Sequence, residues 1–155
     1  MSHPVKAVIR LLVALMLVGG YALGGAVVPV HAATWDGVNP RSSSCWNDRR
    51  FVQSTHLRYA GSGGFAPPII YLYYSPSCRT TWARLTGGTI PEPGNSSGGY
   101  AIIHRNSDGR EFRCSVVDAT GECITPMVND ANVTSYAFGF EDAGAWTAWG
   151  RTASF

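Results

Sequence analysis

Beyond residue 32 the chain contains no lysine: its single lysine is Lys6, and the ten cations that follow are all arginine. Ten carboxylates lie in the same part of the chain, so residues 33–155 are formally neutral. The net charge of +2 on the full chain comes from Lys6 and Arg10. A neutral domain gives no electrostatic reason to expect nucleic acid or an anionic membrane as a partner, because both bind through an excess of positive charge.

The same part of the chain lacks helical periodicity, since no window of ten or more residues repeats its apolar side chains every 3.6 positions. Short segments rich in aromatic and β-branched residues are present instead, separated by turn-forming residues. These segments are residues 57–59, 69–74, 80–85, 100–104, 111–117, 133–140 and 146–149. The sequence therefore predicts an all-β fold, a small antiparallel meander forming a sandwich or barrel.

Two loops divide the later segments. The Asn-Ser-Asp-Gly stretch at residues 106–109 predicts a hairpin, because Asp-Gly accepts the positive φ that tight turns require. Residues 87–99 form a longer polar loop of glycine, proline and serine. If the structure holds it rigid, this loop could be the exposed binding loop of a disulfide-stabilised inhibitor of secreted enzymes, which is one alternative function.

The first 32 residues have the three-part layout of a secretory signal peptide. A short basic stretch precedes an apolar run at residues 11–28, and small residues occupy the two positions that a signal peptidase reads. A membrane anchor is the alternative, but four glycines weaken the run as a helix and no basic cluster follows it. We expect cleavage after Ala32 or Ala33 and a secreted, extracellular product that is not attached to a membrane. The predicted division is a signal peptide at 1–32, an N-terminal arm at 33–45 and a single β-domain at 46–155.

Four cysteines follow the signal peptide, and no C-x-x-C pair occurs among them. The histidines have no matching spacing, so we expect neither a zinc site nor any other metal or cofactor. An even count in a small exported domain predicts two disulfides, for which three pairings are possible. We favour Cys45–Cys78 and Cys114–Cys123, the second pair flanking residues 115–122, which predict two short strands joined by a turn.

Two of these cysteines, Cys45 and Cys78, belong to an ordered sequence motif. The motif resembles that of the YjfA-like family, whose members are small secreted domains of unknown function from Gram-positive bacteria, mainly actinobacteria. Trp35 stands where members of that family often carry a cysteine. The resemblance implies a secreted β-domain and names no catalytic residue or ligand. The motif residues are Asp36, Gly37, Asn39, Pro40, Cys45, Ser75, Pro76, Cys78, Thr80, Trp82, Ala83 and Arg84, followed by the stretch Thr125-Pro126-Met127-Val128.

The central part of this motif also has a physical interpretation. Trp82 and Arg84 share one face of a strand because side chains alternate, and Ala83 and Leu85 share the other. We expect Trp82 to be buried. Arg84 would stack on Trp82 or pair with a carboxylate.

Catalytic constellations are weak in this sequence. The Gly-Asn-Ser-Ser-Gly-Gly stretch at residues 94–99 superficially resembles a protease nucleophile loop, but the scattered His56, His104 and Asp118 predict no triad. A pair of carboxylates could serve a small glycosidase, which is the enzymatic alternative. The available acids are Glu92, Glu111, Glu122, Glu141 and Asp142.

Aromatic side chains provide the strongest functional indication, because residues 33–155 contain five Trp, six Tyr and six Phe. Such rings either fill the interior of a small domain or stack on a ligand. We therefore predict a non-enzymatic secreted domain that binds an extracellular protein or glycan, at the cell wall or within an exported complex. The candidate binding residues are Trp35, Trp46, Tyr71, Tyr73, Trp146 and Trp149.

Overall fold

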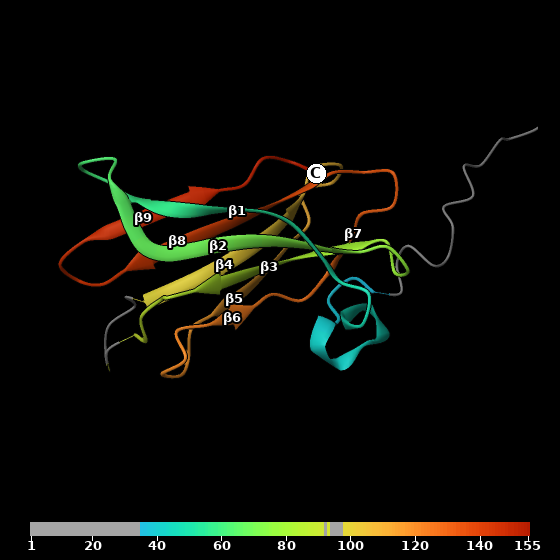
Figure 1. Cartoon of the computed structure of the whole chain (residues 1–155), viewed down its shortest axis with the longest axis horizontal. Coiled ribbons are helices and arrows are strands. Elements are labelled where there is room, and N and C mark those ends of the chain that lie inside the picture. The colour runs from blue at the N-terminus through green and yellow to red at the C-terminus, as the bar shows by residue number, and fades with distance from the viewer. Residues whose placement is uncertain (1–34, 92, 94–97) are drawn as a thin grey trace, which may run out of the picture.

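The computed structural model of the chain describes residues 35–91, 93 and 98–155. It is all-β, as predicted (Figure 1). The predicted signal peptide lies outside the described residues, as do Glu92 and most of the predicted 94–99 stretch. The strands are β1 (Arg50–Tyr59), β2 (Phe65–Ser75), β3 (Thr80–Thr86), β4 (Gly98–Arg105), β5 (Glu111–Ser115), β6 (Cys123–Ile124), β7 (Val128–Asn129), β8 (Ser135–Asp142) and β9 (Thr147–Arg151).

All pairings in the sheet are antiparallel. The strand order is β5-β4-β8-β9-β1-β2-β3-β6. The short strand β7 pairs with the first two residues of β3, Thr80 and Thr81. The sheet curls until its two ends, β5 and β6, lie side by side (Figure 1). The result is a nearly closed barrel, with a seam between β5 and β6 where no ladder pairing occurs among the described residues.

Both predicted disulfides are confirmed, with Cα–Cα distances of 5.6 Å for Cys45–Cys78 and 5.7 Å for Cys114–Cys123. The second bridge joins β5 to β6 and so closes the barrel across the seam.

The prediction of two short strands joined by a turn at residues 115–122 is wrong for the strands and right for the turn, because only Ser115, the end of β5, belongs to a strand in this segment. The backbone turns locally instead: the Gly121 N–H donates to the Asp118 carbonyl, and the Asp118 side chain accepts from the Thr120 N–H. Such side-chain turns compete with strand pairing.

The predicted hairpin at residues 106–109 is confirmed. It joins β4 to β5, and Gly109 has a φ of +70°.

The part of the barrel interior that faces β8 and β9 is filled by side chains from β1, β2 and β3. Leu57, Ile70 and Leu85 on β1, β2 and β3 are fully buried and point at β8 and β9. A side chain on Gly139 of β8 would place its Cβ 2.9 Å from Leu57 Cδ2, and one on Gly150 of β9 would lie 3.1 Å from the same atom. The inward positions at Gly139 and Gly150 must therefore be small.

The N-terminal arm is fastened to the outside of the barrel from its first described residues. It contains two short 3-10 helices, η2 (Pro40–Ser42) and η3 (Ser44–Trp46). The Gly37 N–H donates to the Met127 carbonyl and the Met127 N–H to the Val38 carbonyl, each at 2.9 Å. Trp82 is fully buried, as expected, but on the outer side of β3 beneath this arm, beside Met127.

Within the described ranges, no helix has the length and apolar character needed to span a membrane.

Candidate functional site

The strand β8 carries large rings on its outer side, and opposite them on its inner side it carries alanine and glycine. Tyr136, Phe138 and Phe140 point outward and are half-buried, whereas Ala137 and Gly139 point inward and are buried. A strand with one solvated face ordinarily places its apolar side chains inward. The reversed alternation therefore exposes ring surface that the fold itself does not need.

The strand register assembles these rings into a continuous patch, which we call the outer aromatic face. Phe138 and Phe140 each have a partner on β4 and another on β9, whereas Tyr136 has a partner on β4 alone. Three rows result, running across the strands. They are Arg113–Ile102–Phe138–Arg151, Ser115–Tyr100–Phe140–Trp149–Arg58 and Glu111–His104–Tyr136.

Neighbouring rings within this face contact one another. Tyr100 stacks on Phe140 with 5.0 Å between ring centroids, and His104 stacks on Tyr136 at 4.6 Å. The Trp149 side chain is 54% exposed. Because these rings hold each other in place, they present a rigid surface with little entropy to lose on binding.

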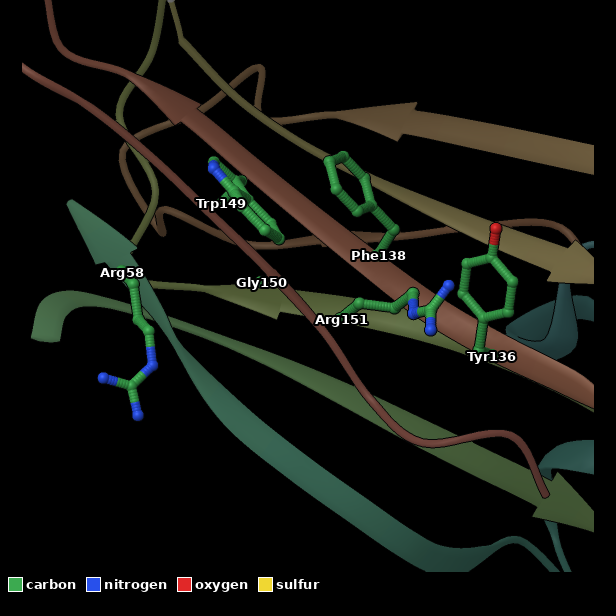
Figure 2. Close-up of a pocket in the computed structure, with 6 residues that line it drawn as sticks. All are labelled: Arg58, Tyr136, Phe138, Trp149, Gly150 and Arg151. Carbon is green, nitrogen blue, oxygen red and sulfur yellow. The ribbon is translucent and has the colours of Figure 1, made fainter. Parts of the chain in front are cut away.

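A groove of about 710 Å³ crosses the face where β1 and β9 separate. The two strands pair only at Arg58–Trp149 and at the adjoining Tyr59–Ala148, and the register of β1 shifts near Arg58. Figure 2 shows the rings of Tyr136, Phe138 and Trp149 along β8 and β9, while the Arg58 side chain on β1 extends away from them. The lining residues are Arg58, Tyr136, Phe138, Trp149, Gly150 and Arg151.

The cations of the face are arranged over its rings. The Arg113 guanidinium lies 3.6 Å from the Tyr100 centroid, and that of Arg151 lies 4.7 Å from the Tyr136 centroid. Arg58 sits over Phe65 at the edge of the face. Across residues 35–91, 93 and 98–155, none of these three arginines forms an ion pair with a carboxylate.

Two carboxylates share the face. Glu111 lies 2.7 Å from His104 Nδ1, so it already has a partner. Asp142 follows Phe140 on the same side of β8 and accepts a hydrogen bond from the Gly144 N–H. The positive charge of the face is therefore concentrated on the Phe138 row.

The six predicted binding residues separate into four places, and only Trp149 of the six lies on the outer aromatic face. Trp146 packs edge-on against Tyr59 at 5.1 Å, beside the core. Tyr71 and Tyr73 stack on each other along the outer side of β2.

The other two predicted binding residues, Trp35 and Trp46, belong to the arm cluster. There Trp46 stacks on Trp82 at 6.2 Å and is covered by the Arg49 guanidinium at 4.2 Å.

Sequence reasoning missed Tyr100, Tyr136, Phe138 and Phe140. A signal for three of them was present: between Tyr136 and Phe140 the rings alternate with alanine and glycine. That alternation shows which residues share a side of the strand. It does not show that the small side is the inner one, because that depends on what the opposite wall supplies.

The motif residues fasten the arm rather than line the groove. The Asp36 carboxylate accepts hydrogen bonds from Arg105 Nη1 at 2.9 and 3.0 Å and from the Asn129 N–H at 2.6 Å. The Asn39 side chain accepts from the Arg41 N–H at the start of η2, with Pro40 as the first residue of that helix.

The later motif residues hold the β2–β3 turn and the strand that follows it. Ser75 Oγ donates to the Asp48 carboxylate at 2.5 Å and accepts from the Cys78 N–H. Arg84 pairs with Glu122 at 2.5 Å, which is one of its two predicted contacts. Thr80 Oγ1 lies 3.2 Å from Met127 Sδ, beneath the arm.

The acids proposed for a glycosidase are dispersed where the structure describes them. Glu141 is fully buried in the barrel, where it accepts hydrogen bonds from the Thr89 N–H and hydroxyl, and burial raises its pKa. Asp142 follows it on the opposite side of β8. Glu122 is shared by Arg84 and Arg41. None of these acids lines the groove.

A small recess of about 190 Å³ beside β6 contains Asp118 and Glu122. Hydrogen bonds from Thr120 lower the pKa of Asp118, and Glu122 is occupied by two arginines. Both carboxylates are therefore occupied by partners within the protein, and neither is placed to act on a glycosidic bond. In the part of the chain that the structure describes, no group of three metal-ligating side chains is found.

The chain was compared with known proteins. A family model described as "Protein of unknown function (DUF2690)" matches residues 33–138, which include the motif and Tyr100, Tyr136 and Phe138 of the outer aromatic face. The uncharacterized protein YjfA of Bacillus subtilis (strain 168) is 29% identical over 143 residues, covering 87% of this chain and 88% of that protein. No solved structure matches the chain. The chain therefore belongs to the DUF2690 family, in agreement with the YjfA-like motif in its sequence.

Proposed function

We propose that this protein is a secreted, non-enzymatic binding module and that its ligand docks on the outer aromatic face. The observation that carries the proposal is the reversed alternation of β8, in which Tyr136, Phe138 and Phe140 point outward while Ala137 and Gly139 point inward. Apolar rings gathered on an outer surface and rimmed by polar groups mark sites of interaction in soluble proteins.

The opposite outer surface supports this interpretation by contrast. On β3 the outward Trp82 is covered by Trp46 and by Met127, and it has no exposed area. The chain thus uses its own arm to cover one set of outward rings. The rings of β8 receive no such cover from the described residues, which leaves them for a partner.

Export is the part of the proposal that rests on the sequence of residues 1–32. Two disulfides support it, because such bridges persist in oxidising compartments outside the cytosol. A binding role is preferred to hydrolysis because the groove is lined by rings and arginines, with no carboxylate among its described lining residues.

The proposal is tested by measuring how much of the purified protein is retained on two fractions from cultures of the organism that produces it. One fraction is the insoluble cell wall, and the other is the proteins of the culture supernatant, immobilised on a resin. We expect binding to one of them. The substitutions Phe138→Ser and Trp149→Ser should each weaken it about tenfold or more, the loss typical of a truncated aromatic contact at a binding site.

The matched control is Phe51→Ser. Phe51 is a 58% exposed ring that lies with Tyr71 and Tyr73, away from the outer aromatic face. Circular dichroism and the melting temperature should show that all three variants fold. Equal retention of the two face variants and the control would contradict the proposal.

A further inference from the structure

Two guanidinium groups bracket the centre of the outer aromatic face. In the row that crosses β5, β4, β8 and β9, Arg113 and Arg151 stand at the ends, with Ile102 and Phe138 between them. Three strand spacings, about 14 Å, separate the backbones of the two arginines, and their guanidinium groups lie over rings of the two neighbouring rows. A ligand lying across the strands would meet a cation, an apolar stretch and a second cation.

The two arginines are oriented by the rings beneath them. Arg113 stacks on Tyr100 at 3.6 Å and Arg151 on Tyr136 at 4.7 Å. Stacking occupies the flat face of a guanidinium and leaves the N–H groups at its edge available, and those edges match a carboxylate. No hydrogen bond from either side chain occurs within the described ranges, so the donors have no internal acceptor there.

The backbone of β8, at the centre of the face, is not available to a ligand. The strand β8 is paired along its length with β4 on one side; on the other it is paired with β9 from Phe138 to Asp142 and bonded to Thr152 and Phe155 beyond that. A peptide strand cannot add to a central strand, because peptide recognition of that kind needs an unpaired edge. Ring stacking and guanidinium contacts are the interactions that remain, and a ligand must satisfy both.

We propose that the outer aromatic face binds an acidic polysaccharide, a chain of sugars that carry carboxylates. The apolar C–H faces of its rings would lie on Phe138 and Trp149, and its carboxylates on Arg113 and Arg151. This inference rests on the proposed function and names its ligand class. Single-stranded nucleic acid also combines rings with negative charge, and binding to an oligothymidylate distinguishes it from the acidic sugar.

Binding to defined polymers tests the assignment, with affinity measured by calorimetry on the secreted protein. The probes are polygalacturonate, its fully methyl-esterified form, poly-L-glutamate and a twenty-residue oligothymidylate. The ester keeps the sugar ring and removes the charge, and polyglutamate keeps the charge and removes the ring. We expect polygalacturonate to bind at least tenfold more tightly than each of the other three, and more weakly as salt is added.

Substitutions then assign the contacts. Arg113→Gln and Arg151→Gln should each reduce the affinity for polygalacturonate at least fivefold. Arg50→Gln, at an exposed arginine of β1 outside the groove lining, should leave it unchanged. Removing the negative charge near Phe140 with Asp142→Asn should raise the affinity, because Asp142 lies on the same side of the strand.

The outcomes separate the ligand class from the binding face. Failure to bind polygalacturonate, equal binding of the ester, or no effect of Arg113→Gln and Arg151→Gln would overturn the acidic-sugar assignment. Equal binding of polyglutamate or oligothymidylate would overturn it in favour of that ligand. In each case the face itself would still stand if Trp149→Ser abolished retention on the culture fractions. If Trp149→Ser and Phe138→Ser changed nothing with any ligand, the proposed function would fail as well.

Discussion

Asp130 is a buried carboxylic acid whose position makes folding sensitive to pH. It is 8% exposed, and its Oδ1 accepts a hydrogen bond of 2.7 Å from the Ser135 hydroxyl. Burial raises its pKa from the usual 3.8 to about 6, although Ser135 and the charge of Arg105 oppose the rise. The folded protein therefore holds this proton more tightly than the unfolded chain does.

The sign of the effect follows from that difference. Between about pH 4 and pH 6 the folded state binds more protons at Asp130, so the free energy of unfolding falls as the pH rises. The contribution is fully present below pH 4 and is lost above pH 6. A shift of this size corresponds to about 3 kcal/mol. Urea unfolding followed at several pH values from 4 to 8 measures it.

Asp130→Asn isolates this contribution from other titrating groups. Asparagine keeps an acceptor for Ser135 and cannot ionise, so the variant should match the wild type near pH 4 and exceed it above pH 6. Parallel stability curves for the two proteins would show that Asp130 has an ordinary pKa in the folded state.

At the scale of elements, β8 shows how one wall of the barrel sets the composition of the other. Leu57 Cδ2 and Ile70 Cβ lie 2.9 and 3.0 Å from the place where a Gly139 side chain would begin. Gly139→Ala should therefore force the opposite wall to move and lower the free energy of unfolding by about 1–3 kcal/mol. Thermal or urea unfolding measures the loss.

Gly61→Ala is the matched control for this substitution. Gly61 lies in the loop between β1 and β2, where a Cβ would have no neighbouring atom within 4 Å, and it does not adopt a positive φ. The change there should stay within about 0.5 kcal/mol. If the two alanine variants were equally stable, the interior of the barrel would have room at β8.

Much of the fold could be predicted from local sequence. The all-β class, the hairpin at residues 106–109 and the burial of Trp82 follow from strand-forming residues, turn chemistry and alternation. The two-residue strands β6 and β7 escaped prediction because so short a segment has no alternation to detect. The pairing order escaped it as well, since contacts between distant strands depend on the whole sheet.

The candidate site was the harder part. The sequence indicates Trp149 as a candidate because tryptophan rings stack on ligands. It does not indicate Phe138 and Tyr136, because their strand has the same alternation whether its rings point inward or outward. The direction is decided by Leu57 and Ile70, which lie about 70–80 positions earlier in the chain and fill the space facing Gly139. The direction of the β8 rings therefore depends on tertiary contacts, which the local sequence does not show.

For the whole molecule, the two disulfides perform different tasks. Cys45–Cys78 ties the N-terminal arm to the β2–β3 turn, outside the barrel. Cys114–Cys123 joins β5 to β6 and holds the barrel closed where strand pairing stops. By chain entropy alone, the longer loop of the first bridge should stabilise slightly more, about 4 kcal/mol against about 3 for the second.

The two disulfides should differ in which region of the protein opens locally when each is removed, although their effects on the free energy of unfolding are similar. The double substitution Cys114→Ala with Cys123→Ala frees β6, a two-residue strand with only two partners on β3, so its amides should exchange with solvent much faster. The arm would keep its contacts to Met127 and Arg105 and stay protected. Removing Cys45 and Cys78 together should reverse the pattern, with fast exchange in the arm and a protected β6. Hydrogen exchange measured by mass spectrometry reports both regions at once. If each double variant loosened both regions equally, the arm and the seam would form one cooperative unit, and the separate tasks assigned to the two bridges would be wrong.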